Sequence, residues 1–489
     1  MIISLDKYKA TGGGTKVEGD IAISENGIYD VTTYATANVY VQPSDNYSYF
    51  DGVVDIEGLR AIGWDDESIG MFRDNNPHYS WQNSVYIVSE ENKALYGVID
   101  SATKIYNYRT DPNFVFCPVF QIGKSTSLSF KGCTNLCGIP KIDTNSSTYG
   151  LSAIDFGNCI KLSTIPLLDT SMITAFREMF NGCSALTGIP HLDTSNVTDM
   201  YSMFCDCKSL TSIPQFDTSK VTHMGSMFKG CSVLTSIPQL DTSKVTKMSW
   251  MFDGCSTLTS IPQLDTSNVT DMSNMFQNCK SLKTIPHLDT SKVTNMENMF
   301  RDCKSLTSIP QFDTSKVTNI NSWLNNCTSL YTLPSLNFSN ATSINLAFAN
   351  TKIEEVGNLN LSKLTYVGAS SYTSPFYYVT TLKTVGEIKC DSLTDINYFL
   401  YSTNNDLTNF GGVKNLGMQP ALSGANSNYF MTKMPNLTYE SVLNVLNGLY
   451  DRASAGYSSM TLKLHANHLA LLSEEDISIA TAKGWTLTV

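Results

Sequence analysis

The chain has 489 residues and a mass of 53.8 kDa, which is too long for one globular core and requires several domains or a repeat array. Its 33 Lys and Arg residues against 44 Asp and Glu residues give a net charge of −11, and no basic run is present that would neutralise a phosphate backbone. No nucleic acid partner is expected. No stretch reaches the roughly 18 apolar residues of a membrane helix and the first residues lack the apolar core of a secretory signal, so neither membrane insertion nor export is expected.

Residues 1–45 are predicted to form a small β-hairpin docking module. The segment IAISENGIYDVTTYATANVYV alternates apolar and polar residues around Asn26-Gly27, a strong signal for a two-stranded hairpin. Residues 46–127 are rich in aromatic side chains and predict a second compact module, with a helix near residues 66–74. This module would cover the first exposed edge of the repeats that follow.

A strict 24-residue period dominates the middle of the chain. The units that start at Leu210, Leu234 and Leu258 are nearly identical, and looser units extend the pattern over residues 128–430, about twelve turns in all. Counted from the first Leu of each unit, positions 15, 18, 19 and 22 are apolar with the i, i+3, i+4, i+7 spacing of a helical face. A short helix is therefore predicted there. The Pro at position 5 restricts the preceding segment to a very short strand.

Each unit is thus predicted to be a strand, a turn and a helix that share one continuous core with their neighbours. Parallel strands lie about 4.8 Å apart and packed helices about 8 to 10 Å apart, so the stack should bend with its strands inside. The predicted fold is an α/β repeat solenoid, a curved right-handed solenoid of leucine-rich-repeat type. Residues 431–489 hold two helical segments and two short strands and are predicted to form an α/β cap.

Two further columns predict structure rather than chemistry. Neighbouring cysteines at position 22 would lie too far apart for disulfides, so they are predicted to be buried free thiols: Cys133, Cys159, Cys183, Cys207, Cys231, Cys255, Cys279, Cys303 and Cys327. Cys205 is expected to face outward, and the states of Cys117, Cys137 and Cys390 are left open. The Asp column at position 8 is interpreted as helix capping rather than calcium binding. No catalytic or metal-binding motif is found, and no cofactor is predicted.

Two rows of side chains are candidates for contact with a ligand. Position 6 forms a polar row at the end of the strand segment: His191, Gln215, Gln239, Gln263, His287 and Gln311. The variable helix face offers Tyr201 and Trp250. Solvated filler is the default interpretation of such a polar row, and contact with a ligand is the alternative, for which a regular amide row suits a repetitive glycan.

The LDTSNVTDMSNMFQNC core resembles the BspA-like class of leucine-rich repeats, found in bacterial surface adhesins and in proteins of gut bacteria and their phages, over roughly residues 128–350. The segment around Asn26 resembles one common in phage tail and fibre proteins. The C-terminal segment resembles the cap that follows such repeats in phage and gut-bacterial proteins.

These resemblances imply binding rather than catalysis. The expected protein is a virion component, such as a tail or head fibre or a decoration subunit, made in the host cytoplasm. It would dock on other virion proteins through its N-terminal module and bind a bacterial surface glycan or protein. The alternatives are a BspA-like adhesin on the bacterial cell surface and a carbohydrate-active fibre enzyme. Association with further copies of the chain is left open.

Overall fold

The computed structural model describes residues 153–489 apart from residues 166, 366, 368–370, 394, 395, 401–405, 419–426 and 429, and before residue 153 it describes short strands and residues 130–132 and 134. The chain divides into two compact units. The first unit is Met1–Val221 with Gly230–Val233, and the second is Thr222–Lys229 with Leu234–Val489. This division falls inside the repeat array, and the predicted domain limits near residues 45, 127 and 430 stay predictions.

The strands of the first unit pair mainly in parallel. Strand β5 pairs in the antiparallel sense with β6 and β8, whereas β1 with β3, β2 with β4, β9 with β11, and β10 with β7 and β12 are parallel. Their bounds are β1 Ile2–Ser4, β2 Ile21–Ile23, β3 Ile28–Asp30, β4 Val39–Val41, β5 Ile87–Ser89, β6 Leu95–Tyr96, β7 Tyr106–Asn107, β8 Phe114–Phe116, β9 Phe120–Gln121, β10 Ser127–Ser129, β11 Ile142–Asp143 and β12 Ala153–Asp155.

The predicted hairpin at Asn26-Gly27 is wrong. Strands form on both sides of it, but β2 pairs with β4 and β3 pairs with β1, both in parallel. Ile2 and Ile28 are register partners and lie about one repeat length apart in the sequence. Pairing between successive turns of the chain has therefore replaced the local hairpin. The helix predicted near residues 66–74 lies outside the described residues.

We call each repeat unit a coil. The helix predicted at positions 15–22 of each coil is also wrong. Backbone N–H groups at odd positions donate to the next coil instead, as from Trp250 to the Ser273 carbonyl and from Phe252 to the Met275 carbonyl, both at 2.9 Å. Tight turns between them place positions 17 and 21 in the left-handed region, as at Trp250 with φ 62°. Successive turns point positions 15, 18, 19 and 22 inward, just as a helical face would, so periodicity alone does not separate the two structures.

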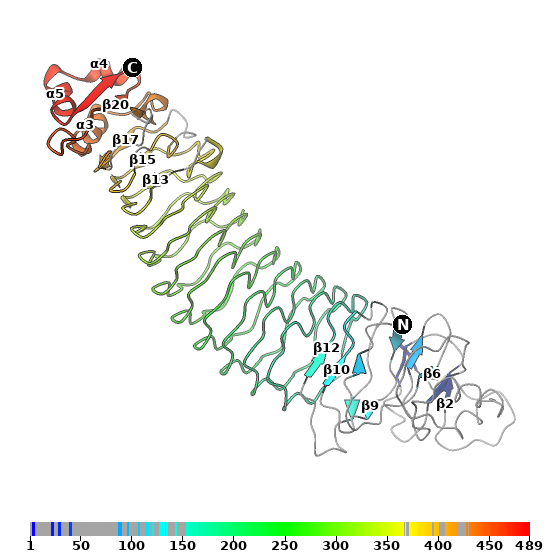
Figure 1. The fold of residues 1–489 in the computed structure, drawn as a ribbon. Coiled ribbons are helices and arrows are strands. Elements are labelled where there is room, and N and C mark those ends of the chain that lie inside the picture. The colour runs from blue at the N-terminus through cyan, green and yellow to red at the C-terminus, as the bar shows by residue number, and fades with distance from the viewer. Residues whose placement is uncertain are drawn as a thin grey trace, which may run out of the picture. The chain divides into compact units, whose positions relative to one another are not determined.

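The predicted short strand forms in the last coils, where Gly replaces Pro at position 5, but not in the coils with Pro over residues 186–329. Strands β13, β15 and β17 form one parallel sheet, and β14, β16 and β18 form a second (Figure 1). Their bounds are β13 Glu355–Val356, β14 Leu359–Asn360, β15 Thr384–Val385, β16 Ile388–Lys389, β17 Asn409–Phe410 and β18 Val413–Lys414. Gly386 N–H donates to the Val356 carbonyl at 2.9 Å, a bond that proline cannot make.

Because the described residues of the array coils form no α-helix, the spacing mismatch from which curvature was predicted is absent from them. Inward side chains still form the predicted core, and Met272, Met275, Phe276 and Cys279 are all fully buried, as the repeat register predicts. In the second unit the position-19 rings stack, with Phe276 5.5 Å from both Phe252 and Phe300 between ring centroids. Burial of each such ring contributes about 1.5 to 3 kcal/mol.

The predicted free thiols are confirmed for the described column, Cys159, Cys183, Cys207, Cys231, Cys255, Cys279, Cys303 and Cys327, all buried. Each thiol donates to a backbone carbonyl of the preceding coil, as Cys279 Sγ does to Phe252 at 3.1 Å. Burial raises the pKa of the Cys183 thiol to about 12. Cys390 is buried and free, and Cys205 is half-buried. Cys117, Cys133 and Cys137 lie outside the described residues.

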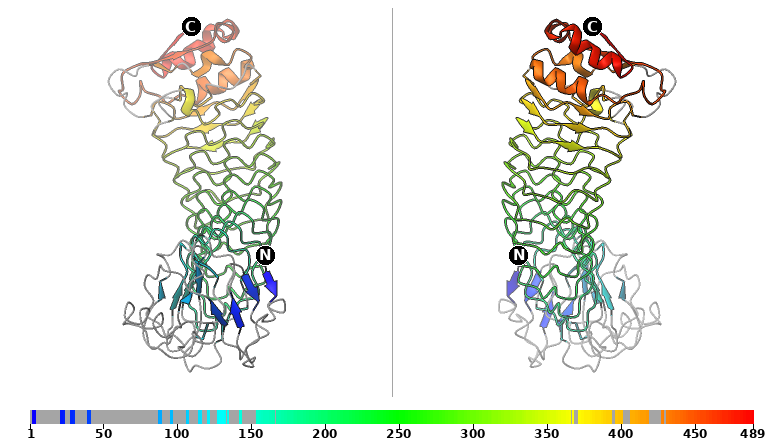
Figure 2. Two further views of the ribbon diagram at one scale, coloured as in Figure 1. Left: turned by 90° about the vertical axis from the view of Figure 1, so that its right-hand side faces the viewer. Right: turned by 90° about the vertical axis from the view of Figure 1, so that its left-hand side faces the viewer.

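The C-terminal segment packs on the last coil. Figure 2 shows its helices at that end of the second unit. Phe410 N–H donates to Ser441 Oγ in α3 at 2.9 Å, and a Cβ on Gly448 would lie 1.3 Å from the Val413 carbonyl oxygen, so only glycine permits this approach. The bounds are 3₁₀ helices Ser371–Thr373 and Phe430–Lys433, α3 Tyr439–Gly448, α4 Ala466–Leu471, α5 Glu474–Ala482, β19 Ser427–Asn428, β20 Met460–Lys463 and β21 Trp485–Thr488.

Both predicted helices and both predicted strands of this segment are confirmed. The strands join β19 in a parallel sheet of order β19-β20-β21. Helix α4 is an addition to the two predicted helices. It begins after His465, whose ring nitrogen Nδ1 accepts from the Asn467 N–H at 3.2 Å and so caps the helix.

Candidate functional site

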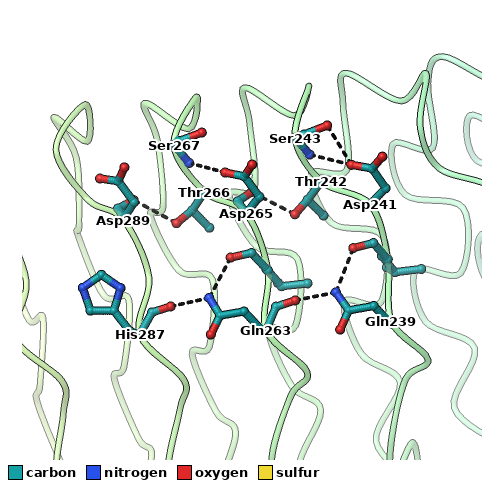
Figure 3. Close-up of a pocket in the computed structure, with 12 residues that line it drawn as sticks. Gln239, Asp241, Thr242, Ser243, Gln263, Asp265, Thr266, Ser267, His287 and Asp289 are labelled. Carbon is teal, nitrogen blue, oxygen red and sulfur yellow. Dashed lines mark hydrogen bonds between the residues drawn. The ribbon is translucent and has the colours of Figure 1, made fainter.

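Two adjoining hollows of about 490 Å³ each lie along the second unit, between the position-6 row and the Asp column. The first is lined by positions 6 to 10 of two coils together with two residues of a third, and the second continues from it; His287 borders both. We call the pair the coil groove. Its linings repeat with the coil: an exposed Gln or His, a buried Leu or Phe, an Asp, a buried Thr and a Ser (Figure 3).

The Asp side of the coil groove is built by turns closed through side chains. Asp265 Oδ1 accepts from the backbone N–H of Ser267 at 2.9 Å, and Asp289 Oδ1 does the same from Ser291. The hydrogen bonds from Ser267 lower the pKa of Asp265, so it stays ionised at neutral pH. The Asp column therefore caps a turn and not the helix that the sequence predicted. Position 8 of a later coil is Asn337, and its Oδ1 caps the same turn at 3.1 Å.

Beneath the groove carboxylates, buried threonines join neighbouring coils of the second unit. Thr242 Oγ1 donates to the Asp265 carbonyl at 2.8 Å, and Thr266 Oγ1 donates to the Asp289 carbonyl at 2.8 Å. Both threonines are 1% exposed. A buried hydroxyl that loses its partner is costly, so these bonds hold the spacing between neighbouring groove walls.

The Gln row forms the opposite wall, and its uniformity has a structural cause. Gln239 Nε2 donates to the Gln263 carbonyl of the next coil at 2.6 Å. It also donates to the carbonyl of Leu240, the next residue in its own coil, at 3.2 Å. Gln263 repeats both bonds, with His287 at 2.6 Å and Leu264 at 3.1 Å. One amide hydrogen thus joins neighbouring coils, and the other is used within its own coil. These side chains therefore have a structural role that the solvated-filler interpretation did not include. Contact between the row and a ligand stays a prediction.

The remaining candidates are placed separately. In the first unit, His191 and Gln215 are exposed, and Gln215 Nε2 donates to the Phe216 carbonyl at 3.1 Å. Gln311 in the second unit donates to the Phe312 carbonyl at 3.2 Å and to Ser335 of the next coil.

The two aromatic candidates are half-buried beneath cations. The Arg177 guanidinium lies 4.3 Å from the Tyr201 ring centroid, and Lys229 Nζ lies 3.9 Å from the Trp250 ring centroid. Lys229 also lies 3.6 Å from a carboxylate oxygen of Asp253. The faces of these rings are thus already engaged by charge. Neither ring lines the coil groove, so Tyr201 and Trp250 are not brought together with the Gln row.

The groove carboxylates Asp241, Asp265, Asp289 and Asp313 were not predicted as ligand contacts, although their column is plain in the sequence. The sequence does not show that these carboxylates and the position-6 side chains line the same groove, because positions 6 and 8 were expected to follow a strand and not to border a hollow. Among the described residues, no group of three or more His, Cys, Asp and Glu is arranged to hold a metal ion. Within that same part of the chain, every helix is too short or too polar to cross a membrane.

Residues 153–260 and 256–359, together less than half of the chain, match a family described as Mycoplasma protein of unknown function, DUF285. No curated protein matches the chain. Solved structures that are similar to it include a leucine-rich repeat protein of T. pallidum (18% identity, 39% of this chain and 82% of that chain, TM-score 0.22), an internalin of Listeria monocytogenes (13%, 68% and 88%, 0.21) and TLR13 in complex with ssRNA13 (14%, 73% and 54%, 0.24). The repeat-solenoid architecture follows from the hydrogen bonds between coils themselves.

Proposed function

We propose that this protein is a non-enzymatic attachment protein that binds an extended, repetitive ligand along the coil groove. The observation that carries the proposal is the groove's periodicity, because each coil offers the next segment of a polymer the same wall of Gln, Asp and Ser. Stacking thus turns one weak contact into a row of equivalent contacts.

The chemistry of the walls favours a ligand rich in hydrogen-bond donors. The amide hydrogens of Gln239 and Gln263 are engaged with backbone carbonyls, and Asp265 is ionised, so oxygen acceptors predominate. Glycan hydroxyl groups supply such donors, whereas an anionic polymer would be repelled by the carboxylates. A bacterial surface glycan is the ligand class that we propose.

The resemblances in sequence carry the finer part of the proposal. We place the coils in the BspA-like class of leucine-rich repeats with right-handed winding, and we place the protein on a phage virion, docked through its N-terminal residues. Mass spectrometry of particles purified from a culture that carries this gene tests the location. Recovery of the protein only from cell envelopes would favour the bacterial adhesin instead.

Binding through the groove is tested by Asp241→Asn, Asp265→Asn and Asp289→Asn made together. Asn337 shows that Asn keeps the turn at this position, so the fold should survive while the groove loses its charge. We expect binding of the labelled full chain to bacterial cells to weaken by about tenfold or more. The control combines Asp406→Asn, Glu440→Gln and Glu475→Gln, which removes the same charge from exposed sites outside the groove. Equal binding by both variants would reject the groove as the site.

A further inference from the structure

Three tyrosines of the coil that starts at Ile353 form an exposed cluster away from the coil groove. Tyr372 is 70% exposed and Tyr378 is 60% exposed, and Tyr377 lies between them, half-buried. The Tyr377 ring centroid is 5.7 Å from that of Tyr372 and 4.4 Å from that of Tyr378. The ring planes are tilted by 59° and 70°, so the cluster presents separate aromatic faces and not one flat patch.

The backbone beneath this cluster is anchored to the preceding coil. Asn350 N–H donates to the Tyr377 carbonyl at 2.8 Å, and the fully buried Phe376 ring stacks on Phe348 with centroids 4.9 Å apart. Val379 is also fully buried. The exposed rings are therefore held on an ordered coil by buried side chains on both sides of Tyr377 and Tyr378.

Tyr378 occupies a backbone position that does not suit it. The bond from Asn350 places Tyr378 at position 21, which is left-handed in every described array coil and which Tyr378 adopts with φ 56°. Other coils fill this position with residues that tolerate positive φ: Gly182, Asp206, Gly230, Gly254, Asn278, Asp302, Asn326 and Asn350. An aromatic side chain there is strained, and it is not explained by packing because its ring is exposed.

We propose that Tyr372, Tyr377 and Tyr378 form a second glycan-binding site, which grips pyranose rings by stacking. An aromatic face packs well on the C–H face of a sugar ring, and a phenol hydroxyl can both donate hydrogen bonds to sugar hydroxyls and accept them. The three side chains carry no charge, which fits a neutral sugar.

A protein partner fits the cluster less well. The centre of a protein interface needs a contiguous apolar patch. Over the described part of residues 353–400, the large hydrophobic side chains that are exposed are Tyr372 and Tyr378 themselves, with no exposed aliphatic neighbour. Separate tilted rings on a polar surface match sugar residues along a chain better than an apolar protein face.

The test compares the full-length chain with Tyr372→Asn, Tyr378→Asn and the double variant in affinity electrophoresis through gels of dextran, amylopectin, galactomannan or xylan. We expect at least one polymer to retard the native chain and each lost ring to weaken that binding by about tenfold. Asn is the residue that other coils use at position 21, so Tyr378→Asn should melt at the same or a higher temperature. Tyr331→Asn removes a lone exposed tyrosine of another coil and should bind as the native chain does.

Several results would overturn the proposal: no retardation by any of the four polymers, unchanged binding by the double variant, or lost binding together with a lower melting temperature. Sedimentation that shows self-association of the native chain, abolished in the double variant, would identify a contact between copies instead. The coil groove variants do not alter this cluster, so failure of the groove experiment leaves this result to be judged separately.

Discussion

Coils with Pro at position 5 and coils with Gly there solve the same problem by different means. In the Gly coils, Leu359 N–H donates to the position-6 carbonyl of Glu387 at 2.9 Å, and short parallel strands form. In the Pro coils, the position-6 carbonyl of Gln263 instead accepts from the side chain of Gln239 at 2.6 Å. The acceptor is the same and the donor differs. A proline column that weakens the backbone ladder is thus compensated by an amide column, which leaves the hollow between coils that we propose as the binding groove.

The largest expected effect concerns the reactivity of the thiols, which tests how tightly both kinds of coil are closed. Burial raises the pKa of Cys183 from 9.0 to about 12, so its thiolate fraction near pH 8 should fall about a thousandfold. In the native protein, a thiol reagent should therefore react rapidly only with accessible thiols such as the half-buried Cys205. In the denatured, unreduced protein, it should react with the majority of the 13 cysteines. Mass spectrometry of the labelled peptides would separate Cys279 in a Pro coil from Cys390 in a Gly coil. Rapid native labelling of either would show that its coil opens readily.

Gly386→Pro should break the ladder of the Gly coils. It removes the N–H that bonds to Val356, and a Cβ on Gly386 would lie 2.6 Å from Asn358 N, so we expect a loss of about 3 kcal/mol in the free energy of unfolding. Gly357→Ala is the control, because a Cβ there meets no atom within 4 Å. Thermal melting of both variants measures the difference. Equal melting temperatures would mean that the ladder adds little to this region.

Gln263→Glu should break the side-chain link of the Pro coils. The carboxylate cannot donate to the carbonyls of Leu264 and His287, and we expect a loss of about 2 kcal/mol. The matched change in a Gly coil is Glu387→Gln, which should alter stability by less than about 0.5 kcal/mol because the backbone there supplies the donor. Chemical denaturation of both variants tests the contrast. If both are neutral, the amide row is not a substitute for the ladder.

Acid should weaken the C-terminal segment and the Pro coils in different pH ranges. His468 is fully buried in the C-terminal segment, and burial lowers its pKa. As the pH falls below about 6.5, the unfolded chain binds a proton that the folded chain does not, so stability falls, by at most about 1.4 kcal/mol at pH 5.5. His468→Gln should remove this dependence, as melting at pH 7.5 and 5.5 would show.

The Asp column also loses its stabilisation as the pH falls, but over a lower pH range. Because the pKa values of Asp265 and Asp289 are lowered by their serine partners, their stabilisation is present above about pH 4 and is lost as the pH falls through the folded values. Asp265 is exposed and Asp289 is half-buried, so each effect is small. The Pro coils should therefore weaken only after the C-terminal segment has done so.

Much of the core was predictable because it depends on which residues recur, and not on how the backbone connects them. The burial of Met272 and Cys279 and the helices of the C-terminal segment follow from the sequence. The coil backbone does not, because turns with left-handed residues mimic helical spacing. The role of Gln263 depends on an acceptor in the next coil, and the tyrosine cluster depends on the register of the irregular coil that contains Tyr378. Neither is visible before the coils are stacked.

The repetition of one set of contacts from coil to coil also bears on how the gene can change. The coil beginning at Leu258 bonds to the coil that follows it through Gln263 and Thr266, just as the coil beginning at Leu234 bonds to the coil at Leu258 through Gln239 and Thr242. An in-frame gain or loss of one 24-residue segment by recombination between near-identical copies would therefore rejoin matching surfaces. Such recombination would change the length of the repeat array and the number of groove segments, while the segments before and after the array would stay the same.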